Sequence, residues 1–281
     1  MMRRNLLANK NIIVYTYLIL ISLLLFSPLL WTIFTSLKPT KEIYHTPITI
    51  FPHKVVLDQY RKTLWQMPDV ATYFKNSVVI TVVSTLLVTI LSSLGGYAFG
   101  RMKFKGRGLF LSFIMLTITI PYAIYLIPVY IMENKVGLIN TNFGLILPYV
   151  ALNLPLAIFI MRGTFHEIPS EMEDAAIVDG CSPLQTWYKI MLPLSKGGVA
   201  AVMVLTYIAI WEEFTFAVTL MPDSAYQTLP VGIKFLKDEA QSWAYGTLSV
   251  VIVLYILPVA IIFLLLQKYL IKGMIEGALK G

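Results

Sequence analysis

Six long apolar stretches constrain the fold of this 281-residue chain more than any other feature. Each has about the 20 residues that a helix needs to cross a hydrocarbon core about 30 Å thick. They are Ile12–Leu37, Ser77–Phe99, Leu109–Met132, Phe143–Met161, Gly198–Met221 and Leu248–Leu270. Because lipid offers the backbone no hydrogen-bond partner, spanning segments of this kind are helical. The sequence therefore predicts an all-α integral membrane protein with six transmembrane helices.

The composition agrees with several membrane spans and excludes other classes. Hydrophobic residues make up 57% of the chain and charged residues only 13%, against about 25% charged in soluble domains. The net charge of +7 comes from short clusters between apolar runs, so it does not indicate nucleic-acid binding. Cys181 is the only cysteine, and no Cys/His cluster suggests a metal. We expect no metal and no cofactor on this chain.

One compact basic cluster predicts the orientation. Arg101, Lys103, Lys105 and Arg107 lie within seven residues and have no acid among them. By the positive-inside rule this loop is cytoplasmic, and with six spans both termini and the 162–197 loop are cytoplasmic too. The long 38–76 loop also carries bases, but it contains acids, and long segments translocate with less regard to charge. We therefore expect a multi-pass protein of the cell membrane with both termini inside.

The predicted spans and their orientation divide the chain into three parts. Residues 1–72 would hold the N-terminal cytoplasmic segment, the first span and an external loop. Residues 73–270 would form the transmembrane core, with a coupling loop at 162–197. Residues 271–281 would form a cytoplasmic tail.

The 162–197 loop contains strong turn signals. Ser170 and Glu173 have the spacing of a capping box at the start of a helix, and Gly180 suits a left-handed turn at its end. A second capping box follows at Ser182 and Gln185, with a proline at the first helical position. We expect Pro193 to end this second helix. We call these two helices, within residues 170–193, the elbow.

The second helix of the elbow has an apolar stripe, formed by Leu184, Trp187 and Met191 at helical spacing. An apolar stripe on a helix usually faces its own core. Two interpretations stay open from the pattern alone: the stripe packs under this chain's own bundle, or it docks on a partner.

The elbow resembles the EAA loop of ABC importer permeases. Residues 173–193, EDAAIVDGCSPLQTWYKIMLP, match that family's pattern of Glu-Ala-Ala, three residues, Gly, nine residues, Ile, one residue and Leu-Pro. The departure is Asp174, where the family usually has glutamate. The matching positions, which the resemblance implies contact an ATPase, are Glu173, Asp174, Ala175, Ala176, Gly180, Ile190, Leu192 and Pro193.

Other segments resemble the carbohydrate-uptake branch, in particular the second permease of the maltose transporter. The segments are Pro28–Trp31 with Ser36–Lys38, Asn76–Phe99, Thr228–Gly232 and Gly277–Gly281. The fifth stretch reads Trp211-Glu212-Glu213-Phe214, where that branch normally has Trp-Asn-Glu-Phe. The resemblance implies a type I importer permease whose tail residues Gly277, Lys280 and Gly281 reach the ATPase.

The resemblance also implies a machine with several parts. Besides this chain it has a second homologous permease, an ATPase dimer that holds ATP and magnesium, and an extracytoplasmic solute-binding protein. This sequence has no G-x-x-x-x-G-K-[ST] loop, so we expect it not to be an enzyme and ATP hydrolysis to lie on a partner. The expected function is uptake of a sugar, most naturally an oligosaccharide. In the implied mechanism the elbow inserts into a cleft of the ATPase and rocks the spans between two states.

The pathway candidates are weaker. Glu212 and Glu213 lie deep along the fifth stretch, where an ionisable residue suggests a functional site. Alternatively both reach water at the outer surface, beside Trp211 in an aromatic belt. Asn153 could line the pathway or form a hydrogen bond between helices.

Two other functions stay open. One is a similar ABC permease for glycerol phosphate, polyamine or another small solute. The other is a membrane-embedded enzyme or secondary carrier, which should show buried His/Asp clusters or repeated half-bundles. The sequence shows neither.

Overall fold

The structure is a computed structural model that describes residues 2–239 and 245–278, and all its regular elements in those ranges are helices. The chain forms two compact units. The first contains Met1–Pro68 and Lys237–Leu254, and the second contains Asp69–Leu236 and Tyr255–Gly281.

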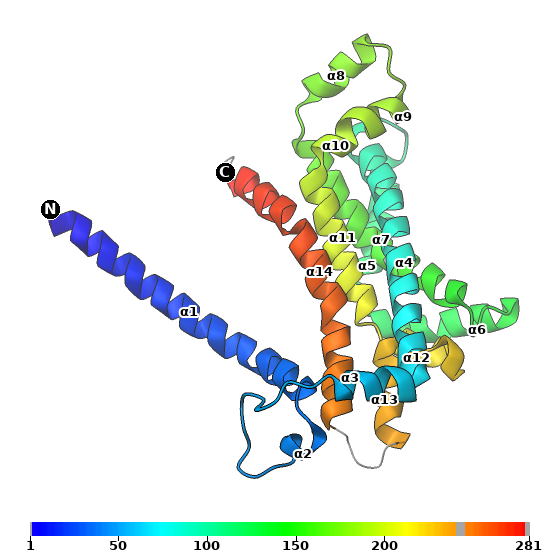
Figure 1. The fold of residues 1–281 in the computed structure, drawn as a ribbon. Coiled ribbons are helices and arrows are strands. Elements are labelled where there is room, and N and C mark those ends of the chain that lie inside the picture. Colours follow the sequence, from blue (N-terminus) through cyan, green and yellow to red (C-terminus); the bar gives the residue numbers. More distant parts are fainter. Residues whose placement is uncertain (1, 240–244, 279–281) are drawn as a thin grey trace. The chain divides into compact units, whose positions relative to one another are not determined.

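The first unit is built around a loop that polar side chains hold in place. Its helices are α1 (Met2–Ser36), α2 (Thr40–Ile43) and α3 (Asp58–Gln66) (Figure 1). The Glu42 carboxylate accepts hydrogen bonds from the backbone N–H of His53 at 2.9 Å and from the Thr49 hydroxyl at 3.0 Å. The His53 N–H bond holds the pKa of Glu42 below its usual value. Lys38, which is 2% exposed, donates to the Thr49 carbonyl. These bonds order the long connection between α1 and α3.

The second unit contains most of the helices. It holds α4 (Pro68–Arg101), α5 (Arg107–Ile118), η1 (Tyr122–Tyr125), α6 (Leu126–Val136), α7 (Asn142–Glu167), α8 (Ser170–Val178), α9 (Pro183–Thr186), the π-helical η2 (Trp187–Met191), α10 (Leu192–Leu194), α11 (Lys196–Trp211), α12 (Thr215–Leu220), η3 (Ser224–Tyr226) and most of α13 (Leu229–Glu239). The last helix, α14 (Tyr245–Ala278), begins in the first unit and ends in the second. Within the second unit, α4, α7 and α11 run side by side, and α8 to α10 lie beyond one end of them (Figure 1).

The number of spans agrees with the sequence prediction. Four described helices are each long and apolar enough to cross a membrane: Val14–Ser36, Asp69–Arg101, Asn142–Glu167 and Tyr245–Tyr269. Two bent pairs, Arg107–Ile118 with Tyr122–Val136 and Pro183–Leu194 with Lys196–Trp211, raise the number to as many as six. The all-α membrane fold is confirmed.

Two expected spans are broken rather than continuous. The third bends by 97° between α5 and the helices that follow, because Pro121 has no N–H to continue the helical ladder. The fifth, expected as one helix from Gly198 to Met221, ends at Trp211 and restarts at Thr215. The cause of this second break is a glutamate side chain, described below.

Two apolar clusters form the core of the second unit. The first surrounds the break in the fifth span and includes Tyr149, Ile210 and Phe216. The second lies where α4, α7 and α11 meet the elbow and includes Tyr97, Met161, Phe165 and Val202. Met191 of the elbow, 0% exposed, belongs to this second cluster. The elbow is therefore packed on the same core as the spanning helices.

Glycine permits the close approach of α4 and α7. A Cβ atom at Gly96 would lie 2.5 Å from Cβ of Met161 and 2.8 Å from the backbone nitrogen of Arg162. Both distances are far inside van der Waals contact, and the second atom belongs to the backbone, which cannot rotate away. Small residues play this role at helix crossings in membranes, where close backbone approach replaces hydrophobic driving force.

We predict that Gly96→Ala destabilises the subunit. Overpacking costs about 1–3 kcal/mol, which outweighs the gain of up to about 1 kcal/mol from replacing a helical glycine by alanine. Gly163→Ala is the matched control, because Gly163 lies on α7 with nothing within 4 Å of its added Cβ. Melting temperature in detergent should fall for Gly96→Ala and stay level or rise for Gly163→Ala. Equal melting temperatures for both variants would contradict the close crossing.

Candidate functional site

The first turn of the elbow is a complete helix-stop motif. Gly180 has a φ of 78°, in the left-handed region. The N–H of Cys181 donates to the Ala176 carbonyl at 2.9 Å, and the N–H of Gly180 donates to the Ile177 carbonyl at 3.0 Å. This pair of bonds is the Schellman arrangement, which satisfies the last carbonyls of a helix. The expected left-handed turn at Gly180 is confirmed.

The second capping box is also confirmed. The N–H of Gln185 donates to the Ser182 hydroxyl at 3.3 Å, and the N–H of Ser182 donates to the Gln185 side chain at 2.8 Å. Pro183 occupies the first helical position, where its missing N–H costs nothing. The short connection from α8 to α9 is therefore fixed from both sides.

The prediction of a first capping box, formed by Ser170 and Glu173, is wrong. Pro169 occupies the N-cap position, and Ser170 is the first residue of α8 with no side-chain cap. The extended backbone of Pro169, with a ψ of 139°, already sets the entry into the helix. The Glu173 side chain does not turn back to the cap but points to α4.

The expected end of the second helix at Pro193 is wrong as well. The helix widens into the π turn η2, in which the N–H of Leu192 donates to the Trp187 carbonyl, and α10 then carries the chain through Pro193 to Leu194. Pro193 falls among the first positions of α10, where an N–H is not needed.

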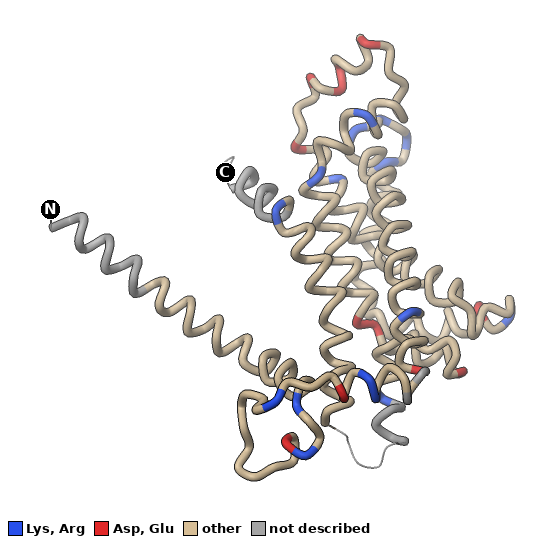
Figure 2. The backbone as a smooth tube through the Cα atoms, in the orientation of Figure 1, with Lys and Arg blue, Asp and Glu red and all other residues tan. Residues whose placement is uncertain are grey.

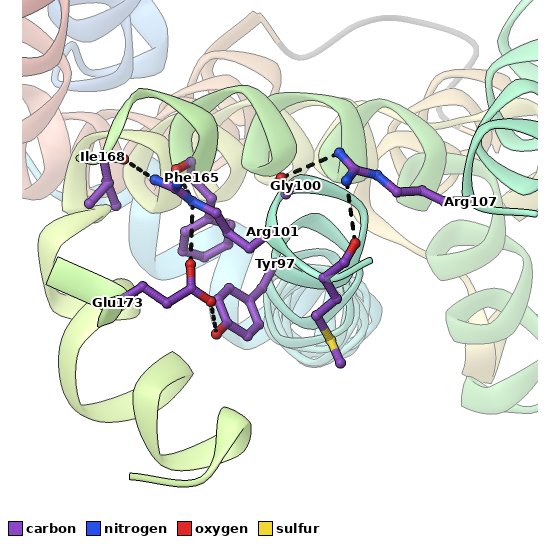
Figure 3. A network of polar contacts seen from close by, with 8 residues as sticks. Tyr97, Gly100, Arg101, Arg107, Phe165, Ile168 and Glu173 are labelled. Carbon is purple, nitrogen blue, oxygen red and sulfur yellow. Dashed lines mark hydrogen bonds and ion pairs between the residues drawn. The ribbon is translucent and has the colours of Figure 1, made fainter. Parts of the chain in front are cut away.

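Glu173 is held by two side chains of α4. Its carboxylate accepts a hydrogen bond from the Tyr97 hydroxyl at 2.8 Å and lies 3.9 Å from Nε of Arg101 (Figure 3). Both Tyr97 and Glu173 are mostly shielded from solvent, and Tyr97 also packs edge-on against the Phe165 ring. This contact ties the first helix of the elbow to a spanning helix.

Arg101 also closes the end of α7. Its Nε donates to the Phe165 carbonyl at 2.9 Å, and its Nη2 donates to the Ile168 carbonyl (Figure 3). The last carbonyls of a helix lack partners within the helix, and a cation there also complements the helix dipole. Arg101 therefore joins α4, α7 and α8 at one point.

In the sequence, Arg101 serves only as a topology signal, and Tyr97 is not predicted to have a role. The signal that could have found both is their spacing, because residues four apart share one face of a helix. Arg107 has a similar local role: it donates to the carbonyls of Gly100 and Met102, both at 3.3 Å. Two of the four bases in the cluster are thus engaged with helix ends.

The tip of the elbow exposes apolar side chains. Val178 is 87% exposed, Ile177 62% and Leu184 59%. In contrast, Trp187 packs on the second core cluster, and Met191 is fully buried in it. The predicted apolar stripe is therefore divided: its later part faces this chain's own core and Leu184 does not. Ile177, Val178 and Leu184 are therefore the candidate interaction surface of the elbow.

The elbow also separates charges. Figure 2 shows Asp and Glu on α8, and Lys and Arg on the neighbouring α9–α10 segment and the 101–107 loop (Figure 2). Among the acids, Asp174 is exposed, whereas Glu173 is engaged with Tyr97 and Arg101. Asp174 therefore remains free to meet a partner.

The other expected coupling residues lie in different environments. Ala175 and Pro193 are exposed, Ala176 is buried, and Ile190 and Leu192 are half-buried. In the tail, Gly277 lies in α14, whereas Lys280 and Gly281 lie outside the described residues.

The pathway candidates do not form one cluster. The Asn153 side chain donates to the Tyr149 carbonyl at 2.8 Å, within its own helix rather than between helices. Trp211 is 2% exposed and donates to the Tyr255 carbonyl at 3.0 Å, so it belongs to the core and not to a surface belt. Glu212 is exposed, whereas Glu213 is half-buried. In residues 2–239 and 245–278, no group of three or more His, Cys, Asp or Glu residues could hold a metal ion.

Family comparison decides the class of protein. Residues 92–276 match the model of the binding-protein-dependent transport system inner membrane component. The chain belongs to this family.

Relatives extend the match over nearly the whole chain. The chain is 34% identical to the sulfoquinovosyl glycerol transport system permease protein SmoH of Agrobacterium fabrum, over 90% of this chain and 88% of the relative. It is 32% identical to the trehalose/maltose transport system permease protein MalG of Thermococcus litoralis, over 97% and 98%. It is 33% identical to the arabinooligosaccharides transport system permease protein AraQ of Halalkalibacterium halodurans, over 90% and 91%.

The fold agrees with a solved transporter. A chain of a bacterial ABC transporter involved in the import of the acidic polysaccharide alginate superposes with a TM-score of 0.79, at 22% identity, over 93% of this chain and 96% of that one. The type I importer-permease fold expected from the sequence is thus confirmed.

We predict that Tyr97→Phe loosens the elbow without unfolding the subunit. The substitution keeps the ring against Phe165 and removes the hydrogen bond to the Glu173 carboxylate, which is worth about 1.5 kcal/mol or more. Deuterium exchange of the amides in residues 170–181 of the purified subunit should accelerate about tenfold. Tyr188→Phe, at an exposed tyrosine of the same elbow, is the control and should leave exchange unchanged. Unchanged exchange in Tyr97→Phe would show that this contact does not hold the elbow.

Proposed function

We propose that this chain is one permease subunit of an ATP-driven, binding-protein-dependent importer of a sugar, most naturally an oligosaccharide, and that it forms half of the translocation pathway. The support comes from the family match and from relatives whose names specify trehalose, maltose, arabinooligosaccharides and a sulfosugar glycoside. The matches cover about nine-tenths or more of this chain and of those relatives.

The proposal includes several partners. A second homologous permease would complete the pathway, and a pair of ATPase subunits would hold ATP and magnesium. A solute-binding protein outside the membrane would deliver the sugar. A related solved complex contains an alginate pentasaccharide-bound periplasmic protein, which supports this last partner for the fold class. The absence of a phosphate-binding G-x-x-x-x-G-K-[ST] loop from the sequence supports a separate ATPase.

The elbow is the proposed coupling element, and its exposed apolar tip carries the proposal. Ile177, Val178 and Leu184 project from a turn that two capping motifs fix. Docking this tip into the ATPase would bury apolar surface, and the exposed Asp174 would meet a basic group at the rim. We further propose that the tail residues Gly277, Lys280 and Gly281 reach the ATPase dimer.

The mechanism follows from what the elbow is attached to. Closure of the ATPase dimer on ATP would move the tip. Because Glu173 is bonded to Tyr97 on α4 and Arg101 joins α4 to the end of α7, this movement would pass to both spans. ATP binding would then bias the transmembrane helices between an inward-open and an outward-open arrangement.

The orientation is part of the same proposal. The elbow, the 101–107 loop and both termini would face the cytoplasm, where the ATPase is, and the 38–76 loop would face outside. Lys103 and Lys105 are exposed in the 101–107 loop, as the positive-inside rule expects of cytoplasmic bases.

We predict that Gly180→Val uncouples transport. A side chain at a φ of 78° costs about 1–2 kcal/mol, and a β-branched one costs more; the added Cβ itself meets nothing within 4 Å. The strain should tilt the tip and displace it from the ATPase. The subunit should still insert and pair with the second permease, while co-purification of the ATPase, sugar uptake and coupled ATP turnover are lost.

Gly137→Val is the matched control. Gly137 has a φ of 72°, also has open space around its Cβ position, and ends α6 rather than α8. Gly137→Val imposes the same backbone strain away from the elbow and should leave ATPase binding normal. If both variants lose the ATPase, strain in general is responsible; if Gly180→Val transports normally, the elbow is not the coupling element.

A second prediction uses the native Cys181, the only cysteine in the chain, which is partly exposed beside the tip. In intact cells a membrane-impermeant maleimide added outside should leave it unlabelled. In inside-out vesicles labelling should occur, and stripping the ATPase from the vesicles should increase it several-fold, because the docked partner shields the turn. Labelling from outside intact cells would reverse the proposed orientation.

A further inference from the structure

The break in the fifth span is built around Glu213. Its carboxylate accepts hydrogen bonds from the backbone N–H groups of Phe216 at 2.8 Å and Ala217 at 3.1 Å, which are the free N–H groups at the start of α12. It also accepts a bond from the Tyr149 hydroxyl at 2.6 Å and interacts with the Tyr122 hydroxyl. A carboxylate that accepts three hydrogen bonds beside a helix N-terminus is well satisfied. Glu213 therefore has a structural role in holding the break.

The adjacent Glu212 has the opposite environment. It follows Trp211 as the C-cap residue of α11, and its side chain is exposed. The break also has a cation beside it, Lys234, whose ammonium lies 5.7 Å from the centroid of the Phe214 ring and is engaged with that face.

Contacts with α14 give the depth of Glu212. The neighbouring Trp211 donates to the Tyr255 carbonyl at 3.0 Å. Tyr255 lies near the middle of the apolar span Tyr245–Tyr269, about 15 Å along the helix from Tyr245 at 1.5 Å per residue. By this contact Glu212 lies well inside the apolar length of that span, which is long enough to cross a hydrocarbon core about 30 Å thick. This position favours the pathway interpretation over the one in which Glu212 reaches water only at the outer surface.

An exposed carboxylate at this depth cannot face lipid without a large cost, and such residues face water-filled cavities or the bundle interior. We propose that Glu212 is a specificity-determining residue of the translocation pathway, exposed to its aqueous cavity and held there by Glu213. Its negative charge selects against acidic solutes. It favours neutral saccharides, whose hydroxyls donate hydrogen bonds to a carboxylate, and amino-substituted ones, whose ammonium group pairs with it.

This inference rests on the proposed function and narrows its substrate class. The branch that the sequence resembles normally has asparagine at this position. An acidic sugar would meet a like charge at Glu212, at a point where the low surrounding dielectric strengthens the repulsion. The relatives named for an acidic polysaccharide or a sulfosugar are therefore poor guides to the cargo of this chain.

The test measures charge selection in the cavity without knowledge of the natural sugar. In the complete transporter, with Cys181→Ser as background, Glu212→Cys should react with water-soluble methanethiosulfonates. A separate variant, Thr215→Cys, carries its cysteine at the exposed first position of α12 and keeps Glu212. The measured quantity is a ratio: the rate at which Thr215→Cys reacts with the cationic trimethylammonioethyl reagent, divided by the rate at which it reacts with the anionic sulfonatoethyl reagent. Adding Glu212→Gln should lower this ratio by about fivefold or more, because the field that attracts cations is removed.

Glu213→Gln is the matched control, since it removes the same charge one residue away. Because the Glu213 carboxylate is occupied by hydrogen bonds to Tyr149, Phe216 and Ala217, Glu213→Gln should lower the melting temperature and should change the reagent ratio much less than Glu212→Gln does. If it prevents assembly, Glu212→Asp replaces it; that variant retains the charge and should retain the ratio. No reaction at either cysteine, an unchanged ratio in Glu212→Gln, or a ratio lost in Glu212→Asp would overturn the proposal.

The two proposals fail in different ways. If the chain were not a sugar importer permease, ATPase co-purification and sugar uptake would fail while the reagent ratio still responded to Glu212→Gln. If only the role of Glu212 were wrong, uptake and co-purification would be normal and the ratio would not respond.

Discussion

The guanidinium of Arg101 is shared by three segments of the chain, and the attachment of the elbow to the spanning helices depends on it. It belongs to the end of α4, it donates to the carbonyls of Phe165 and Ile168 at the end of α7, and it lies beside the Glu173 carboxylate of α8. A planar group with five donors can serve several acceptors at once, which a lysine ammonium cannot do with the same geometry. The elbow is consequently an extension of two spanning helices. Hydrogen bonds and an ion pair connect the elbow to α4 and α7. Met191 adds a packing contact with the second core cluster.

The fold could be predicted from the sequence where local chemistry decides it. Apolar length identified all the spans, and Gly180 and the Ser182–Gln185 box identified the elbow turn, because each of these features needs only its own neighbours along the chain. The errors occurred where a distant residue intervened. Ser170 had the right spacing for a cap, but Glu173 was attracted to Tyr97 on another helix. Pro193 had the right chemistry to stop a helix, but a π turn moved it to a position where no N–H is needed. The break at residues 212–214 depends on Tyr149, which lies in another span.

The candidate site was predicted by resemblance more than by physics. Glu173 and Asp174 were both expected to meet the ATPase, because a motif names positions and not directions. In the structure only Asp174 is exposed, and Glu173 serves the chain's own architecture. Likewise the stripe of Leu184, Trp187 and Met191 left two interpretations open. Trp187 and Met191 pack on this chain's own core, whereas Leu184 is exposed, and its docking on a partner stays a prediction. Helical spacing shows that residues share a face, but only the packing of other helices decides where along that face the core ends.

Two pairs of adjacent acids now show a common logic. Successive residues of a helix point about 100° apart, so Glu173 and Asp174 do not share one environment. Glu212 and Glu213 differ because the helix ends at this point. In Glu173–Asp174 and again in Glu212–Glu213, one carboxylate is engaged by other groups of the chain and the other is exposed. The satisfied member fixes the backbone, and this fixes the direction of the exposed member. A substitution at the satisfied acid would therefore disturb function indirectly, through the position of its neighbour, whereas one at the exposed acid would change the charge that a partner or a solute meets. Loss of function at either residue of such a pair does not by itself identify which carboxylate makes the contact; stability measured beside activity separates the two.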